Sequence, residues 1–125
     1  MAHVIADSDV IIDFLRGSSS SDQFDLLLQK GSLGTTAINA FEVLSGAKSK
    51  KAREVIGALL DVMPVYSCDA QAAQAAVAIR HQLGTIGRPI GMAGFLIAGI
   101  CVANNLKLYT GNRKHFEPID GLVLI

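Results

Sequence analysis

Five short segments, separated by stretches in which apolar residues recur at helical spacing, constrain the fold of this chain more than any other feature. They cover residues 3–6, 33–36, 62–66, 106–110 and 122–125. Most of them read as continuous apolar runs, which is typical of parallel strands that are covered on both faces. Strands that alternate with one or two helices are joined by parallel crossovers. We therefore expect an α/β fold, a three-layer α/β/α sandwich with a five-stranded parallel sheet.

The length of the chain predicts a single domain over residues 1–125, large enough to bury a core. The formal net charge is zero, which disfavours nonspecific coating of polyanions but leaves local basic patches open. The most apolar stretch, residues 90–103, is shorter than the roughly 20 residues that span a membrane. Cys68 and Cys101 accompany no secretory leader, so we expect free thiols in a cytoplasmic protein without a membrane segment.

The first predicted strand ends in acid, because Asp7 follows it directly and Asp9 falls in the first turn of the next helix. In open α/β sheets, ligands bind at the carboxyl ends of the strands. Two carboxylates this close repel each other unless a cation or a proton lies between them. The pair therefore suggests a site for a hard cation. Helix capping by Asp7, and a favourable interaction of Asp9 with the helix dipole, explain the same residues without a ligand.

A third carboxylate, Glu42, lies in a helix predicted over residues 37–48. The apolar residues of that helix predict a buried stripe of Ala37, Ile38, Phe41 and Leu44. Glu42 borders the stripe, where it loses hydration unless a lysine, a solvated geometry or a cation compensates. Because sequential strands are usually neighbours, we expect Glu42 at the same sheet edge as Asp7. Oxygen ligands of this kind suit Mg²⁺ or Mn²⁺ rather than zinc.

Four motifs, taken together, resemble the PIN-domain ribonucleases of the VapC toxin type. They are DSDVIIDFLRG at 7–17, TTAINAFEVLSGA at 35–47, GRPIGMAGFLIAGICVANNLKLYTGNRKHF at 87–116 and IDGLVLI at 119–125. The resemblance implies an endoribonuclease that uses Mg²⁺ or Mn²⁺ and leaves a 5′-phosphate and a 3′-hydroxyl. It also implies an RNA substrate, a VapB-like antitoxin as partner, and a homodimer.

The same resemblance assigns roles to individual residues. Asp7 and Glu42 match the first two acids of the family, which are catalytic and bind the metal. Asp9 and Asn112 match polar catalytic positions near the cation, and Ser8 and Thr110 match hydroxyl positions beside it.

Gly94 departs from the family pattern, because it stands where the resemblance predicts a third acid, an aspartate. Glycine offers no side-chain oxygen, and inside a helix it costs about 1 kcal/mol relative to alanine. Disturbing even an indirect partner of a metal costs roughly 10–100-fold in affinity or activity, so losing a direct ligand should cost at least that. We therefore expect a site that is built but impaired. The alternative is a catalytically inert domain that only binds an antitoxin or RNA.

RNA also needs cationic contacts for its phosphates. The candidates flank the expected acidic edge: Arg80, Arg88, Arg113 and Lys114. For any one of them, a solvated surface charge is the favoured interpretation.

A phosphatase of the haloacid dehalogenase type also begins with a strand that ends in Asp-x-Asp. That class places a threonine and a glycine-rich turn soon after the second acid, whereas here Val10, Ile11 and Ile12 continue as helix. A clear later lysine motif is also lacking, so the sequence disfavours this class.

Overall fold

A parallel sheet of four strands runs through the middle of the computed structural model, which describes residues 2–17 and 21–125. The strands are β1 (Val4–Ala6), β2 (Leu33–Thr36), β3 (Val65–Tyr66) and β4 (Lys107–Tyr109), in the order β3-β2-β1-β4. The helices are α1 (Ser8–Leu15), α2 (Ser21–Gln29), α3 (Ala37–Gly46), α4 (Lys50–Asp61), α5 (Ala70–Thr85), α6 (Met92–Ala103) and α7 (Arg113–Phe116).

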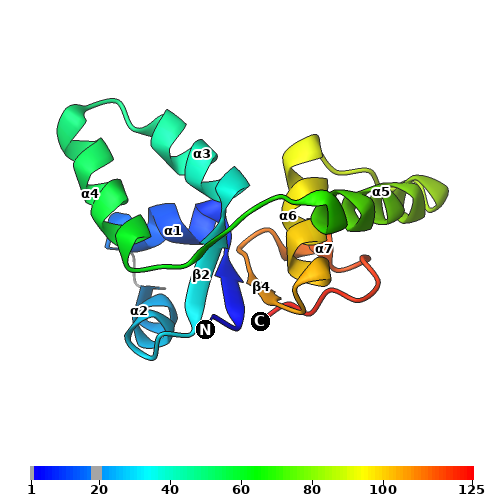
Figure 1. Cartoon of the computed structure of the whole chain (residues 1–125), viewed down its shortest axis with the longest axis horizontal. Helices are drawn as coiled ribbons and strands as arrows, with labels where there is room; N and C mark the ends of the chain where they lie inside the picture. The colour runs from blue at the N-terminus through cyan, green and yellow to red at the C-terminus, as the bar shows by residue number, and fades with distance from the viewer. Residues whose placement is uncertain (1, 18–20) are drawn as a thin grey trace.

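Helices cover the sheet on both faces, as Figure 1 shows: α1 to α4 lie on one side and α5 to α7 on the other. Two hydrophobic cores result, and β1 contributes to both. Val4 and Ala6 belong to the first core, while Ile5 between them belongs to the second. Successive side chains of a strand point to opposite faces, which explains why β1 is apolar at every position. The predicted α/β fold with a parallel sheet between helical layers is confirmed.

The predicted fifth strand is reduced to a single bridge. In the segment 122–125, Leu124 pairs with Leu108 of β4 in parallel. The backbone N–H of Leu108 donates to the carbonyl of Val123 (2.8 Å), and that of Ile125 donates to the carbonyl of Leu108 (3.1 Å). The segment thus continues the parallel sheet beyond β4 through this one bridge.

The order of the strands reverses beside β1. The chain runs from β1 outward to β2 and β3, and then returns to add β4 on the other side of β1. At such a switch point the connections leave in opposite directions, which opens a crevice at the carboxyl ends of the two strands. Asp7 follows β1 and Thr110 follows β4, so both residues stand at this crevice.

Helix α3 is rotated relative to the prediction and ends earlier, at Gly46. The expected buried stripe is wrong for three of its four residues: Ala37 is exposed, Phe41 is 71% exposed, and Leu44 is 36% exposed, whereas Ile38 packs against the second core. Asn39 and Val43 face the sheet instead. The cause is polar, because the buried hydrogen bonds of Asn39, described below, fix the rotation of the helix more strongly than its apolar residues do.

Helices α5 and α6 pack closely on the second face of the sheet. A Cβ built on Gly99 of α6 would lie 2.5 Å from the backbone oxygen of Ala72 and 2.9 Å from the Cβ of Ala76, both on α5. Glycine therefore permits the contact. Across the part of the chain that the structure describes, every helix is too short or too polar to cross a membrane.

We expect Gly99→Ala to lower the free energy of unfolding by about 1–3 kcal/mol, because the added methyl group meets backbone atoms that cannot move independently. Gly57→Ala is the matched control. Gly57 also lies inside a helix, but nothing is within 4 Å of a Cβ built there, so alanine should stabilise by about 0.5–1 kcal/mol. Urea denaturation measures both changes. Equal effects of the two substitutions would contradict the proposed close contact.

Candidate active site

The side chain of Asp7 is the centre of the site. It lies at the start of α1 and is 9% exposed. Its Oδ1 accepts hydrogen bonds from the backbone N–H of Ser8 (2.8 Å) and from Nδ2 of Asn39 (3.0 Å). Its Oδ2 accepts one from the hydroxyl of Thr110 (2.7 Å). Asp7 therefore caps helix α1, but it is also held by groups from two other parts of the chain.

Asn39, which no sequence pattern singled out, connects Asp7 to Ser8. Its backbone N–H donates to Oγ1 of Thr36 (3.1 Å), whose hydroxyl donates back to Oδ1 of Asn39 (2.7 Å). The remaining Nδ2 donates to Asp7 and to the hydroxyl oxygen of Ser8 (2.9 Å). The signal for this residue is a polar side chain three positions after a helix-capping threonine, which is a variant of the capping box.

Glu42 reaches the same place as Asp7. The hydroxyl of Ser8 donates to Oε1 of Glu42 (2.7 Å) and accepts from Asn39, which also binds Asp7. Glu42 is exposed, so hydration lowers the cost of its charge. The two carboxylates are therefore connected by a chain of hydrogen bonds that runs from Asp7 through the side chains of Asn39 and Ser8 to Glu42.

Asp9 anchors the loop that follows β4. Its Oδ1 accepts from the backbone N–H of Val10 (2.8 Å), and its Oδ2 accepts from that of Gly111 (2.9 Å). A Cβ at Gly111 would lie 2.7 Å from this Oδ2, so glycine allows the approach. Burial, and then the nearby charge of Asp7, raise the pKa of Asp9 above its ordinary value.

These three acids share a cavity of about 260 Å³. The polar residues that line it are Asp7, Ser8, Asp9, Glu42, Asn112 and His115, and the apolar ones are Ile90, Gly91, Ala93, Gly94, Ile97 and Phe116. Within the described residues, neither lysine nor arginine lines this cavity. Nor do three His, Cys, Asp or Glu side chains, in that same part of the chain, converge closely enough to hold a metal ion by themselves. The arrangement suits a cation that is bound by fewer protein ligands and by water.

Gly94 lines the cavity from the first turn of α6. It is the third residue of that helix rather than an interior one, so the expected helix penalty applies less strongly there. A Cβ at this position would lie 2.8 Å from Cδ1 and 3.2 Å from Cγ1 of Ile90. The side chain of Ile90 therefore occupies the space next to the position where the sequence predicts an acid.

Asn112 lines the cavity but turns its side chain to a neighbour. Its backbone N–H donates to Oγ1 of Thr110 (3.0 Å), and its Nδ2 lies 2.9 Å from Nδ1 of His115. His115 did not stand out in the sequence, because the three histidines show no metal-ligand spacing. The spacing of three residues from Asn112, within one helical turn, is the signal that could have found it.

The structure separates the four cationic candidates. Arg88 and Lys114 border a second hollow of about 260 Å³, which shares Ile90 and His115 with the acidic cavity. Nη1 of Arg113 instead donates to the backbone carbonyl of Ile125 (2.6 Å), at the far end of the chain.

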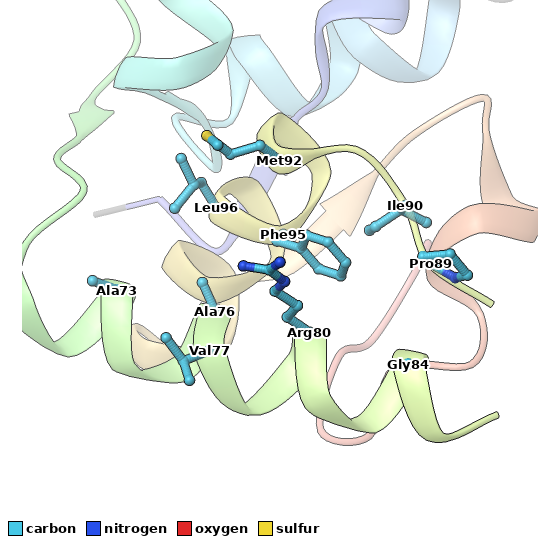
Figure 2. Close-up of a pocket in the computed structure, with 10 residues that line it drawn as sticks. All are labelled: Ala73, Ala76, Val77, Arg80, Gly84, Pro89, Ile90, Met92, Phe95 and Leu96. Atoms are coloured by element: carbon cyan, nitrogen blue, oxygen red, sulfur yellow. The ribbon is translucent and has the colours of Figure 1, made fainter. Parts of the chain in front are cut away.

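Arg80 lines a different and largely apolar groove between α5 and α6. Figure 2 shows its side chain pointing from α5 toward Phe95 on α6. Among the described residues, Ile90 is the only one that lines both this groove and the acidic cavity.

Comparison with known proteins gives a consistent result. Residues 4–122 match the PIN domain family. The tRNA(fMet)-specific endonuclease VapC of Shigella flexneri is 27% identical over 126 residues, which cover 98% of this chain and 96% of that protein.

Two solved structures are similar over nearly their whole length. The DNA-bound VapBC of Salmonella typhimurium superposes with a TM-score of 0.85 at 25% identity, covering 100% of this chain and 98% of the other. VapBC2 of Rickettsia felis, bound to a DNA fragment from its promoter, has a TM-score of 0.80 at 25% identity. The match covers 98% of this chain and 96% of the other.

We expect Thr110→Val to lower the free energy of unfolding by about 1–3 kcal/mol, because it leaves Oδ2 of the buried Asp7 and the backbone N–H of Asn112 without their hydroxyl partner. Thr85→Val is the control, since its exposed hydroxyl only donates to the carbonyl of His81. Chemical denaturation of both variants measures the difference. A Thr110 variant as stable as the Thr85 variant would show that the hydroxyl does not support Asp7.

Proposed function

Because the chain belongs to the PIN domain family, and its relatives include VapC ribonucleases, we propose that it is a divalent-cation-dependent endoribonuclease weakened by Gly94. One observation carries the proposal. Asp7, Asp9 and Glu42, which come from two separate segments of the chain, line one cavity at the switch point of the sheet. Their charges have no lysine or arginine partner on the described wall of that cavity. A bound cation would offset the repulsion between these carboxylates.

The donor set fits one Mg²⁺ or Mn²⁺ ion better than a pair. Asp7 and Glu42 would hold the ion, and water would complete the shell, since Mg²⁺ usually keeps several waters. Asp9 holds the loop after β4 through its hydrogen bond with the backbone N–H of Gly111, and it adds negative charge to the site. A second ion would need the carboxylate that Gly94 does not supply.

When bound, such an ion activates water and neutralises charge that develops on a phosphodiester. The chain's own residues prepare the site for it. Asn39 and Thr110 hold the carboxylate of Asp7 in one orientation, and Ser8 does the same for Glu42. Ile97 and Phe116 form a buried apolar part of the wall, which strengthens electrostatic interactions by excluding water.

A second candidate function is a catalytically inert domain that binds an antitoxin or RNA. The packing around Gly94 favours it, because the side chain of Ile90 fills the adjacent space. An aspartate at position 94 would need that space to be open. The hydrogen-bonded group of Asp7, Asn39, Ser8 and Glu42 supports activity instead, because it maintains two carboxylates beside each other at a cost in repulsion.

We also propose a VapB-like antitoxin as partner, since the similar solved structures are VapBC assemblies. The homodimer rests on the resemblance to VapC proteins and is tested by light scattering on the purified chain.

Cys68 and Cys101 are both free, which supports a reducing compartment such as the cytoplasm.

We expect Mn²⁺ to raise the Tm of the chain. At about ten times its Kd, a ligand that binds only the folded state raises Tm of a domain this size by about 4–6 °C. Asp7→Asn and Glu42→Gln should abolish the shift, while Asp61→Asn, an exposed acid on α4 outside the cavity, should retain it. A Tm that does not respond to millimolar Mn²⁺ would argue against a cation site.

We expect the double variant Gly94→Asp with Ile90→Val to cleave RNA at least about tenfold faster than the natural chain in Mn²⁺. The valine removes the Cδ1 that lies 2.8 Å from a Cβ at position 94, so the aspartate has room. The control is Gly94→Asn with Ile90→Val, which has the same volume without the charge. Cleavage is followed on labelled RNA, with a chelator added to show dependence on the ion.

Three outcomes of this assay separate the two functions. Slow, chelator-sensitive cleavage by the natural chain and faster cleavage by the aspartate variant support the proposal. Cleavage by the aspartate variant alone favours the inert domain. Equal cleavage by the natural chain and the aspartate variant shows that Gly94 does not impair the site.

A further inference from the structure

A basic hollow adjoins the acidic cavity. It is lined by Gly87, Arg88, Pro89, Ile90, Lys114 and His115. These residues come from the loop between α5 and α6 and from α7, which are distant in sequence. Nη2 of Arg88 lies 3.4 Å from the backbone carbonyl of Lys114 and donates to it, so a direct hydrogen bond connects the two segments. Among the residues that the structure describes, no aspartate or glutamate lines this hollow.

His115 stands at the junction of the two spaces, because it lines both of them. Its Nδ1 pairs with Nδ2 of Asn112, which can only donate. In the tautomer in which Nδ1 accepts this bond, the proton is on Nε2, which is then a hydrogen-bond donor. Through Asn112 and Thr110, a line of hydrogen bonds connects this ring to Asp7.

We propose that Arg88, Lys114 and His115 form a subsite for one phosphate of single-stranded RNA, next to the phosphodiester in the acidic cavity. This inference rests on the proposed ribonuclease function and deepens it. Two cationic side chains and one imidazole N–H donor match the anionic oxygens of a phosphate. Negative charge in the adjoining cavity repels a bare phosphate, so a cationic group beside it is needed to draw the strand in.

The same geometry assigns the other two candidates no part in this subsite. Within the described residues, neither Arg113 nor Arg80 lines this hollow. Nη1 of Arg113 donates to the carbonyl of Ile125, and Arg80 lies on the apolar groove of Figure 2. The subsite also sets a direction. The strand enters over the loop at 86–91 and α7, rather than over α5.

Binding is measured by fluorescence anisotropy with a labelled single-stranded RNA in EDTA, so that no cleavage occurs. We expect Arg88→Ala with Lys114→Ala to weaken binding about tenfold. The slope of log K against log salt should become shallower by about 0.7 for each RNA phosphate that the variant no longer neutralises. The control, Arg80→Ala with Lys51→Ala, removes the same charge from α5 and α4 and should change binding less than twofold. Thermal melting verifies that both variants are folded.

His115 is tested in the same assay. His115→Ala should weaken binding about two- to fivefold, whereas His115→Gln, which keeps an N–H donor at a similar distance from the backbone, should retain most of it.

The outcomes separate this subsite from the proposed ribonuclease activity. Selective loss of RNA binding in the Arg88 and Lys114 variant supports the subsite, even if the chain proves unable to cleave. Equal losses in this variant and in the Arg80 and Lys51 control overturn it, because total charge then explains binding. Unchanged binding and unchanged cleavage in the Arg88 and Lys114 variant also overturn it, while leaving the ribonuclease proposal intact.

Discussion

The buried carboxylate of Asp7 is the constraint on which the rest of the structure depends. A charge with so little exposure is costly unless hydrogen-bond donors surround it. Here the donors come from the next residue, from Asn39 on α3 and from Thr110 after β4. These segments are held together at the one edge of the sheet where its strand order reverses. The acidic cavity is a consequence of satisfying this single side chain.

The neighbouring residues extend this polar arrangement outward. Asp9 holds Gly111 through its backbone N–H, and Thr110 and Asn112 continue to His115. Two spaces of opposite charge therefore meet at one histidine. The acidic one lies at the ends of β1 and β4, and the basic one lies between the loop at 86–91 and α7. This juxtaposition suits an anionic strand that must approach carboxylates, and it needs no net positive charge on the protein as a whole.

Gly94 shows how local packing and site chemistry interact. Gly94 lies in the first turn of α6 beside the acidic cavity, and the side chain of Ile90 occupies the space that a Cβ there would need. An apolar group in this position lowers the polarity of the wall while the carboxylates on the opposite wall remain. The site therefore combines an intact half, from β1 and α3, with an altered half, from α6. The intact half supports RNA cleavage, whereas the altered half favours a domain that only binds an antitoxin or RNA.

The sequence alone determined the layered α/β architecture, because continuous apolar strands between helices can only be buried from both sides. It also indicated Asp7 and Glu42, whose chemistry is visible from residue type and position. Tertiary structure decided the rest. The rotation of α3 follows from hydrogen bonds of Asn39 across 32 positions of sequence, which no periodicity reports. The division of Arg80, Arg88, Arg113 and Lys114 among three surroundings likewise depends on where loops from distant segments meet. Periodicity records what a side chain buries, whereas its polar partners are set only when the chain has folded.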